Sequence, residues 1–337
     1  MLPFLSGLLS PKASVHLDLS WVATETFFSQ IGRDLEPQYW SSMSTVITCL
    51  SLAIQGKVTE DKSALLCQLT RLSRLVLRSL EPSTPSAEET DASIFLDLPL
   101  LERLHIFRSG ASQVRLNCPK VDELILAGVA LKSFSGMPSS IRIVRLSLFQ
   151  GSVPLKAIFP AHSAQQLQSL STVEDPERVT EADTIRRLCL NGKLTHLRIE
   201  WAEPQNNRIA AAAATAGAFS LHAPWQAVPH TLQDVFLDLC LDKGIPRILE
   251  QLLNLTSLSL RHSKGNCLHL DRPLDPFLDM PRLKQLRLES RWQPGGADGA
   301  GALRSWTPAA LRLLGLAEKR LTEMRVASPG RSFTLIY

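Results

Sequence analysis

The stretch Leu255-Thr256-Ser257-Leu258-Ser259-Leu260 decides the fold, because its spacing of leucines recurs along most of the chain. Its last two leucines lie two residues apart, as on one face of a short strand. The first leucine lies three residues earlier, where the chain turns into that strand. One such strand cannot bury its apolar side alone, but stacked copies can. The spacing therefore predicts a parallel sheet with a continuous leucine core.

The pattern LxxLxL occurs ten times when Ile, Val or Met may replace Leu, and 59 of the 337 residues are leucine. The copies are Ile47-Leu50-Leu52, Leu72-Leu75-Leu77, Leu101-Leu104-Ile106, Val121-Leu124-Leu126, Ile143-Leu146-Leu148, Leu194-Leu197-Ile199, Leu232-Val235-Leu237, Leu255-Leu258-Leu260, Leu283-Leu286-Leu288 and Leu321-Met324-Val326. A degenerate copy stands at Leu17 and Leu19. Close copies are 20 to 29 residues apart, which leaves room for a strand and a short helix.

Several copies also carry a lead-in before the pattern, as in residues 253–258 and 280–286. With it, the chain resembles leucine-rich repeat proteins over nearly its whole length. The resemblance implies an α/β solenoid curved into a horseshoe, with a parallel inner sheet and helical or irregular outer segments. Residues 116–124 (LNCPKVDEL) resemble the Cys-Pro version of the repeat found in F-box-type repeat proteins. No F-box is expected here, because repeat-like strands begin near Leu17; a missing N-terminal domain stays open.

We expect a single repeat domain, residues 1–337, with about 10–11 repeats. Loops or insertions are predicted where the spacing lengthens or turn-forming residues gather: residues 81–93, 150–180, 201–230 and 291–308. Residues 185–190 imitate the repeat but lie nine residues before the next copy, too close for two adjacent strands. We therefore predict that residues 181–190 form a helix on the outer side.

The composition favours a folded protein of the cytoplasm. The formal net charge is only +4, and no run of about 18 uncharged apolar residues exists to span a membrane. The six cysteines lie far apart and form no CxxC pair, so we expect reduced thiols and no secretion. Cytoskeletal or nuclear association stays open as an alternative.

The sequence carries no signature of catalysis: HExxH, GxSxG and GxxxxGK[ST] are all absent. His262, Cys267 and His269 form the densest set of metal-ligand types, but they lack a fourth ligand. We therefore expect no enzyme activity, no metal and no cofactor. An enzyme with its site in the insertions at 201–230 or 291–308 is the remote alternative.

The repeat geometry predicts which side chains are available to a partner. The leucines point into the core, so the residues beside them on each strand point outward. Over the strands that start at 72 to 143, these positions carry four arginines and one acid, Glu123. The predicted partner-binding residues are Arg74, Arg78, Arg103, His105, Phe107, Arg145 and Phe149. The alignment puts Phe107 and Phe149 at the same position of two strands.

Arginine and aromatic side chains together are typical of the centres of protein interfaces. We therefore predict a protein-binding scaffold or substrate-recognition module, with a protein partner that the sequence does not identify. The alternative is nucleic-acid binding through the arginines of the same face. The modest charge and the lack of basic residues interleaved with stacking aromatics weigh against it.

Overall fold

The computed structural model describes the chain in fourteen stretches: residues 14–19, 44–54, 60–79, 93–108, 112–148, 153–161, 163–174, 181–190, 193–201, 227–239, 247–262, 280–290, 323–328 and 331–336. The chain divides into two compact units, Met1–Leu167 (unit 1) and Gln168–Tyr337 (unit 2). The expectation of one repeat domain along the whole chain stays a prediction. Among the described residues, no helix has the length and apolar character that crossing a bilayer requires.

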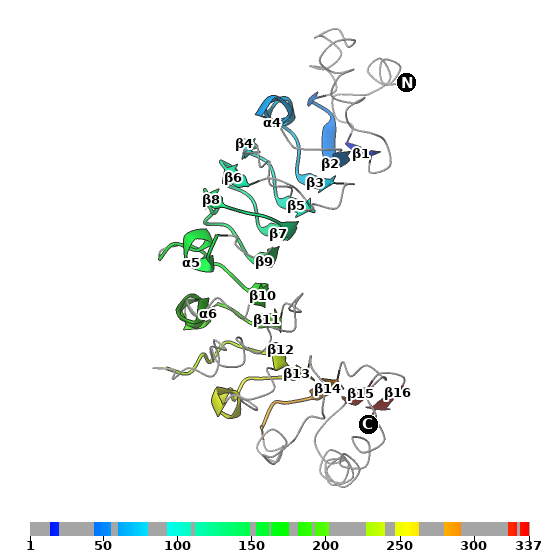
Figure 1. The fold of residues 1–337 in the computed structure, drawn as a ribbon, viewed down its shortest axis with the longest axis vertical. Coiled ribbons are helices and arrows are strands. Elements are labelled where there is room, and N and C mark those ends of the chain that lie inside the picture. Colours follow the sequence, from blue (N-terminus) through cyan, green and yellow to red (C-terminus); the bar gives the residue numbers. More distant parts are fainter. Residues whose placement is uncertain are drawn as a thin grey trace, which may run out of the picture. The chain divides into compact units, whose positions relative to one another are not determined.

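Unit 1 contains an inner sheet of six parallel strands that follow one another in chain order (Figure 1). They are β1 (Val15–Leu19), β2 (Ile47–Ile54), β3 (Arg74–Ser79), β5 (Arg103–Phe107), β7 (Glu123–Val129) and β9 (Ile143–Leu148). Leu50, Leu75, Leu104 and Leu124 lie in register on neighbouring strands, and each is at most 1% exposed. The repeated leucines therefore form the predicted continuous core.

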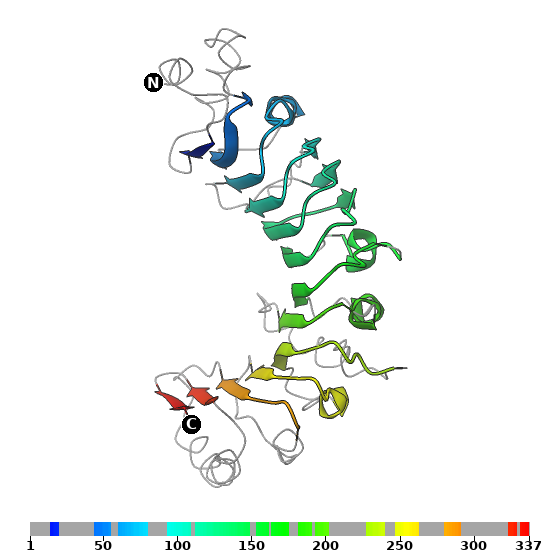
Figure 2. The same ribbon diagram turned by 180° about the vertical axis from the view of Figure 1, so that it is seen from behind.

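A second layer covers the core side of this sheet (Figure 2). It contains the helices α4 (Glu60–Cys67) and α5 (Leu155–Ile158), and a parallel sheet of β4 (Ser93–Leu96), β6 (Gln113–Leu116) and β8 (Ser133–Ser135). The apolar side chains of these short strands, such as Ile94, Val114 and Phe134, are buried. This outer sheet was not predicted, because the resemblance to leucine-rich repeats implied only helical or irregular outer segments.

The length of a repeat largely decides which outer element it contains. The two repeats of 20 residues, from Leu101 and from Val121, contain the strands β6 and β8. The repeats of 25 and 26 residues, from Ile47 and Ile141, contain α4 and α5. A strand advances about 3.3 Å per residue and a helix about 1.5 Å, so a short repeat can cross the outer side only as a strand. The 29-residue repeat from Leu72 carries β4, but its residues 80–92 lie outside the described stretches.

Unit 2 repeats the architecture with β10 (Ser169–Glu174), β11 (His196–Trp201), β12 (Asp234–Leu239), β13 (Ser257–His262), β14 (Gln285–Ser290) and β15 (Glu323–Ser328), all parallel. A last strand, β16 (Arg331–Ile336), pairs antiparallel with β15 and was not predicted. The outer elements are α6 (Glu181–Leu190) and the 3-10 helix η1 (Arg247–Gln251). The predicted helix at 181–190 is thus confirmed. It buries Ile185, Leu188 and Cys189, which share one helical face.

One predicted repeat has the wrong register. Its core residues are Ile141, Val144 and Leu146, not Ile143, Leu146 and Leu148. The hydrogen bonds where the strands begin show this. The Asp122 carbonyl accepts hydrogen bonds from the N–H groups of Arg142 and Ile143, both at 2.9 Å. One repeat earlier, the Glu102 carbonyl accepts the equivalent bonds from Asp122 and Glu123. The pattern LxxLxL matches both at Ile141 and two residues later at Ile143, so the sequence fits either register.

One repeat, between residues 148 and 194, is absent from the predicted copies. Leu167, Leu170 and Thr172 are buried, and β10 places Leu170 and Thr172 in register with Leu197 and Ile199. The threonine at the last leucine position hid the pattern. The predicted insertion at 150–180 therefore contains α5 and a whole strand. The insertions at 81–93, 201–230 and 291–308 fall almost entirely outside the described residues.

Candidate functional site

The inner sheet of unit 1 has one face turned away from the outer layer, which we call the open face. Side chains from neighbouring strands form three rows on it, set by the strand register. From β2 to β9, the first row is Cys49, Arg74, Arg103, Glu123 and Ile143. The middle row is Ser51, Val76, His105, Ile125 and Arg145, and the last row is Ala53, Arg78, Phe107, Ala127 and Ser147.

The structure brings most of the predicted partner-binding residues together on this face. Arg74 and Arg103 stand opposite each other on adjacent strands, and both are exposed. Arg145 is also exposed, two strands beyond Arg103. Arg78 stands opposite Phe107, with its guanidinium carbon 5.5 Å from the ring centroid, which is within range of a cation–π contact.

Phe149 does not join this group. It lies outside the described residues, and the corrected register of β9 places Ser147 in the row of Phe107. The prediction that Phe107 and Phe149 occupy equivalent positions is therefore wrong. It failed because the repeat had been aligned two residues too late.

His105 lies in the floor of the open face and is only 8% exposed. Its Nε2 is 3.6 Å from a carboxylate oxygen of Glu123 and has no hydrogen-bond partner, while its ring meets Phe107 edge-on with the centroids 6.1 Å apart. Burial lowers the pKa of His105, and the nearby Arg74 and Arg103 lower it further, whereas Glu123 opposes them. The ring is therefore neutral at pH 7, and it offers a partner little surface.

The charges of the open face are unequally paired. A carboxylate oxygen of Glu123 lies 3.7 Å from the guanidinium Nε of Arg103. Glu123 is the one carboxylate in the three rows from β2 to β9. Arg74 and Arg145 have no carboxylate partner within the part of the chain that the structure describes. With four arginines against Glu123 and, on β1, Asp18, the formal net charge of the face is +2.

The corresponding face of unit 2 holds a cluster that the sequence analysis did not select. The guanidinium carbons of Arg198 and Arg261 lie 4.1 Å and 4.6 Å from the ring centroid of Phe236, which is 9% exposed. Glu200 forms ion pairs with both arginines. The signal was present in the sequence, since all four residues stand at predicted outward positions. Unlike Arg74 and Arg145, however, both arginines already have a carboxylate partner, Glu200, so we do not select this cluster as the docking site.

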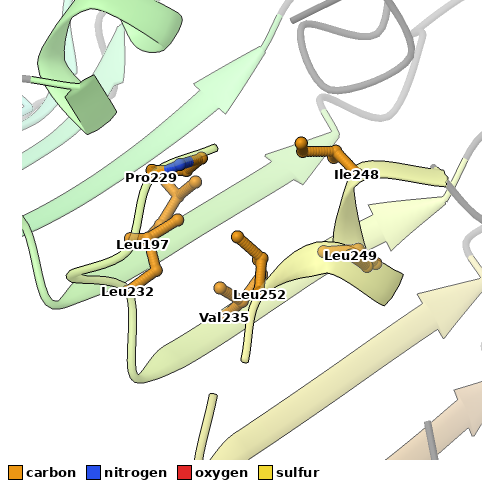
Figure 3. A pocket seen from close by; sticks show the side chains of 7 residues that line it. All are labelled: Leu197, Pro229, Leu232, Val235, Ile248, Leu249 and Leu252. Atoms are coloured by element: carbon orange, nitrogen blue, oxygen red, sulfur yellow. The ribbon is translucent and has the colours of Figure 1, made fainter. Parts of the chain in front are cut away.

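An apolar hollow in unit 2 belongs to the core (Figure 3). It is lined by Leu197, Pro229, Leu232, Val235, Ile248, Leu249 and Leu252. The space between these side chains does not admit a water-sized sphere. Because no water-sized sphere fits there, we assign the hollow to the packing of η1 against β11 and β12 and not to a ligand.

The described cysteines are free thiols: Cys49, Cys67, Cys118 and Cys189. Burial raises the pKa of Cys118 to about 11 and that of Cys189 to about 12, so both are protonated at neutral pH and poor nucleophiles. No group of three or more His, Cys, Asp or Glu side chains suited to a metal ion occurs in the described stretches. The candidate ligands Cys267 and His269 lie outside those stretches.

Comparisons with known proteins add little to this geometry. No family model matches the sequence, and no curated protein matches it. Among solved structures, the chain is similar to one in the crystal structure of a TLR13–ssRNA13 complex, with 14% sequence identity and a TM-score of 0.32. The match covers 80% of this chain and spans 47% of the other, about half of its length. The strands, their register and their buried leucines define the observed class, a stack of leucine repeats with parallel sheets and few helices among the described residues.

Proposed function

We propose that this chain is a non-catalytic, protein-binding scaffold of the leucine-rich repeat kind, and that its partner docks on the open face of unit 1. The observation that carries the proposal is the pair of exposed arginines without a carboxylate, Arg74 and Arg145, on the same face as Phe107. Arginine and aromatic side chains supply directional hydrogen bonds and contact area, and both are enriched where proteins bind one another.

A stacked sheet suits this role because it presents a broad and rigid surface. The same scaffold could serve as a substrate receptor, as the Cys-Pro repeat at 116–124 would imply. A cytoplasmic location is part of the proposal, since the thiols of buried cysteines persist in a reducing compartment.

The test is a pull-down from native lysate with the full chain and the variant Arg74→Glu, Arg103→Glu, Arg145→Glu. We expect at least one protein to bind the wild type and to be lost from the variant, in the presence of ribonuclease and deoxyribonuclease. A matched control changes three exposed basic residues of unit 1 that lie off the open face: Arg115→Glu, Lys120→Glu, Lys156→Glu. Circular dichroism first establishes that all three proteins are folded.

Retention of the same proteins by both variants would show that the open face is not the docking site. Binding that nuclease treatment abolishes would instead favour the alternative, in which the arginines contact phosphates. A steep loss of affinity with rising salt would accompany that outcome.

A further inference from the structure

From the open face we infer the chemistry of the partner: an extended protein segment that carries carboxylates about four to five residues apart, with an apolar side chain between them. The inference rests on the proposed function, since it names what the same face would bind. It is carried by the charge, register and apolar floor of that face.

The positive charge of the open face is not a by-product of the chain's many arginines. Over five strands, β2 to β9, the outward positions carry Arg74, Arg78, Arg103 and Arg145 against Glu123. Over five strands of unit 2, β11 to β15, the equivalent positions also carry four arginines: Arg198, Arg261, Arg287 and Arg325. There they are offset by five acids: Glu200, Asp234, Asp238, Glu289 and Glu323. Unit 1 adds only Asp18, on β1, to Glu123, so two of its four arginines lack a balancing carboxylate that a partner can provide.

The register adds a specific anion-binding geometry. Arg74 and Arg103 stand directly opposite on parallel strands about 4.8 Å apart, where like charges destabilise a sheet. Glu123 lies on the far side of Arg103, at 3.7 Å, so it offsets the positive charge of Arg103 but not that of Arg74. A carboxylate placed over Arg74 would relieve the other, through charge-assisted hydrogen bonds that guanidinium groups form well.

The surroundings favour a peptide over a nucleic acid. Val76 and Ile125 flank the buried His105 in the middle row, and both are partly exposed. Together with Phe107 they give the face an apolar floor between its arginines. Glu123 stands within the arginine group, where it would repel a continuous phosphate backbone. A protein segment can place an apolar side chain on the floor and its carboxylates on the arginines.

The distance between the outer arginines sets the spacing. Arg74 lies on β3 and Arg145 on β9, three strand steps across the sheet and one row further along the strand, so their positions are about 16 Å apart. An extended peptide advances about 3.3–3.6 Å per residue, so two carboxylates about four to five residues apart would reach both sites. This defines a probe that can be synthesised without knowing the natural partner.

The experiment uses fluorescence anisotropy with the full chain. The probes are a labelled peptide of about ten residues, with glutamates four apart around a central leucine, and the same peptide with glutamine for glutamate. At about 0.1 M salt, where charges are screened over roughly 10 Å, we expect the glutamate peptide to bind at least about tenfold more tightly than the glutamine peptide. The Arg74→Glu, Arg103→Glu, Arg145→Glu variant should lose this preference. The Arg115→Glu, Lys120→Glu, Lys156→Glu control should keep it.

Three results would overturn the inference: no binding of the glutamate peptide, equal binding of the two peptides, or tighter binding of a single-stranded RNA oligonucleotide. The first two leave the proposed function standing if the lysate partner is still lost from the open-face variant, because the face would then bind a protein of different chemistry. Loss of both readouts would reject the proposed function as well.

Discussion

At the scale of single residues, His105 couples the stability of unit 1 to pH. Because burial lowers its pKa, the unfolded chain takes up a proton below about pH 6.5 that the folded chain resists. The free energy of unfolding should therefore be unaffected above that pH and fall as the pH drops below it. Urea titrations near pH 7.5 and pH 5.5 would measure the loss.

Replacing the histidine isolates its contribution. His105→Leu fits beside Val76 and Ile125 and has no proton to gain, so its stability should fall less than that of the wild type over the same pH interval. His196→Leu, at an exposed position of β11, is the control for the substitution itself, since it removes a histidine from the surface of unit 2. An equal fall in wild type and His105→Leu would mean that other groups cause the acid sensitivity.

The same residues show how far sequence reasoning reaches. The alternation of inward and outward residues alone places Arg74, Arg103 and Phe107 outward, because the pattern LxxLxL fits their repeats in one register only. It does not reveal that His105 is buried, since burial depends on Glu123 and Phe107 of adjacent positions closing around the ring. It fails for Phe149 because the pattern fits both at Ile141 and two residues later at Ile143, and only backbone hydrogen bonds from the preceding repeat choose between the two registers.

At the scale of elements, the outer sheet depends on a close approach between β6 and the turn after β8. Gly136 has a φ of +83°, and a Cβ atom there would lie 1.8 Å from the carbonyl oxygen of Leu116. Gly136→Ala combines an unfavourable backbone conformation with a clash against backbone, so we expect a loss of at least about 3 kcal/mol. Chemical denaturation measures it.

Gly128 provides a matched comparison. Its φ is +65°, at the irregularity of β7, but the nearest atom to an added Cβ is the Cγ of Arg108 at 3.4 Å. Gly128→Ala should therefore cost only about 1 kcal/mol, the backbone contribution alone. If the two alanine variants were equally stable, the tight contact with Leu116 would be absent in solution.

The outer elements were harder to predict than the inner strands for a physical reason. The inner strands can be recognised in the sequence from leucines at a fixed spacing. The outer strands are three or four residues long, as in Ser133–Ser135, and bury one or two side chains each. For β6 and β8 the short repeat explains the strand, and the length of a repeat becomes informative only once every repeat has its correct register.

At the scale of the whole molecule, a stack of repeats should lose stability locally. Each strand contacts only its neighbours along the sheet, so folding free energy is approximately a sum over repeats and their interfaces. Leu104 in unit 1 and Leu258 in unit 2 hold the same repeat position, and both are 0% exposed. Truncating either to alanine should cost about 2–5 kcal/mol, because a large cavity replaces the side chain.

The site of that loss distinguishes a stack from a single cooperative core. In Leu104→Ala, we expect amide hydrogen exchange to accelerate in β3, β5 and β7 and to change little in β12, β13 and β14. Leu258→Ala should give the reverse pattern. Hydrogen exchange read by mass spectrometry on the full chain resolves both sets of strands. Equal acceleration everywhere in both variants would mean that the repeats unfold together, and nearest-neighbour contacts would then not suffice to describe the stability of this chain.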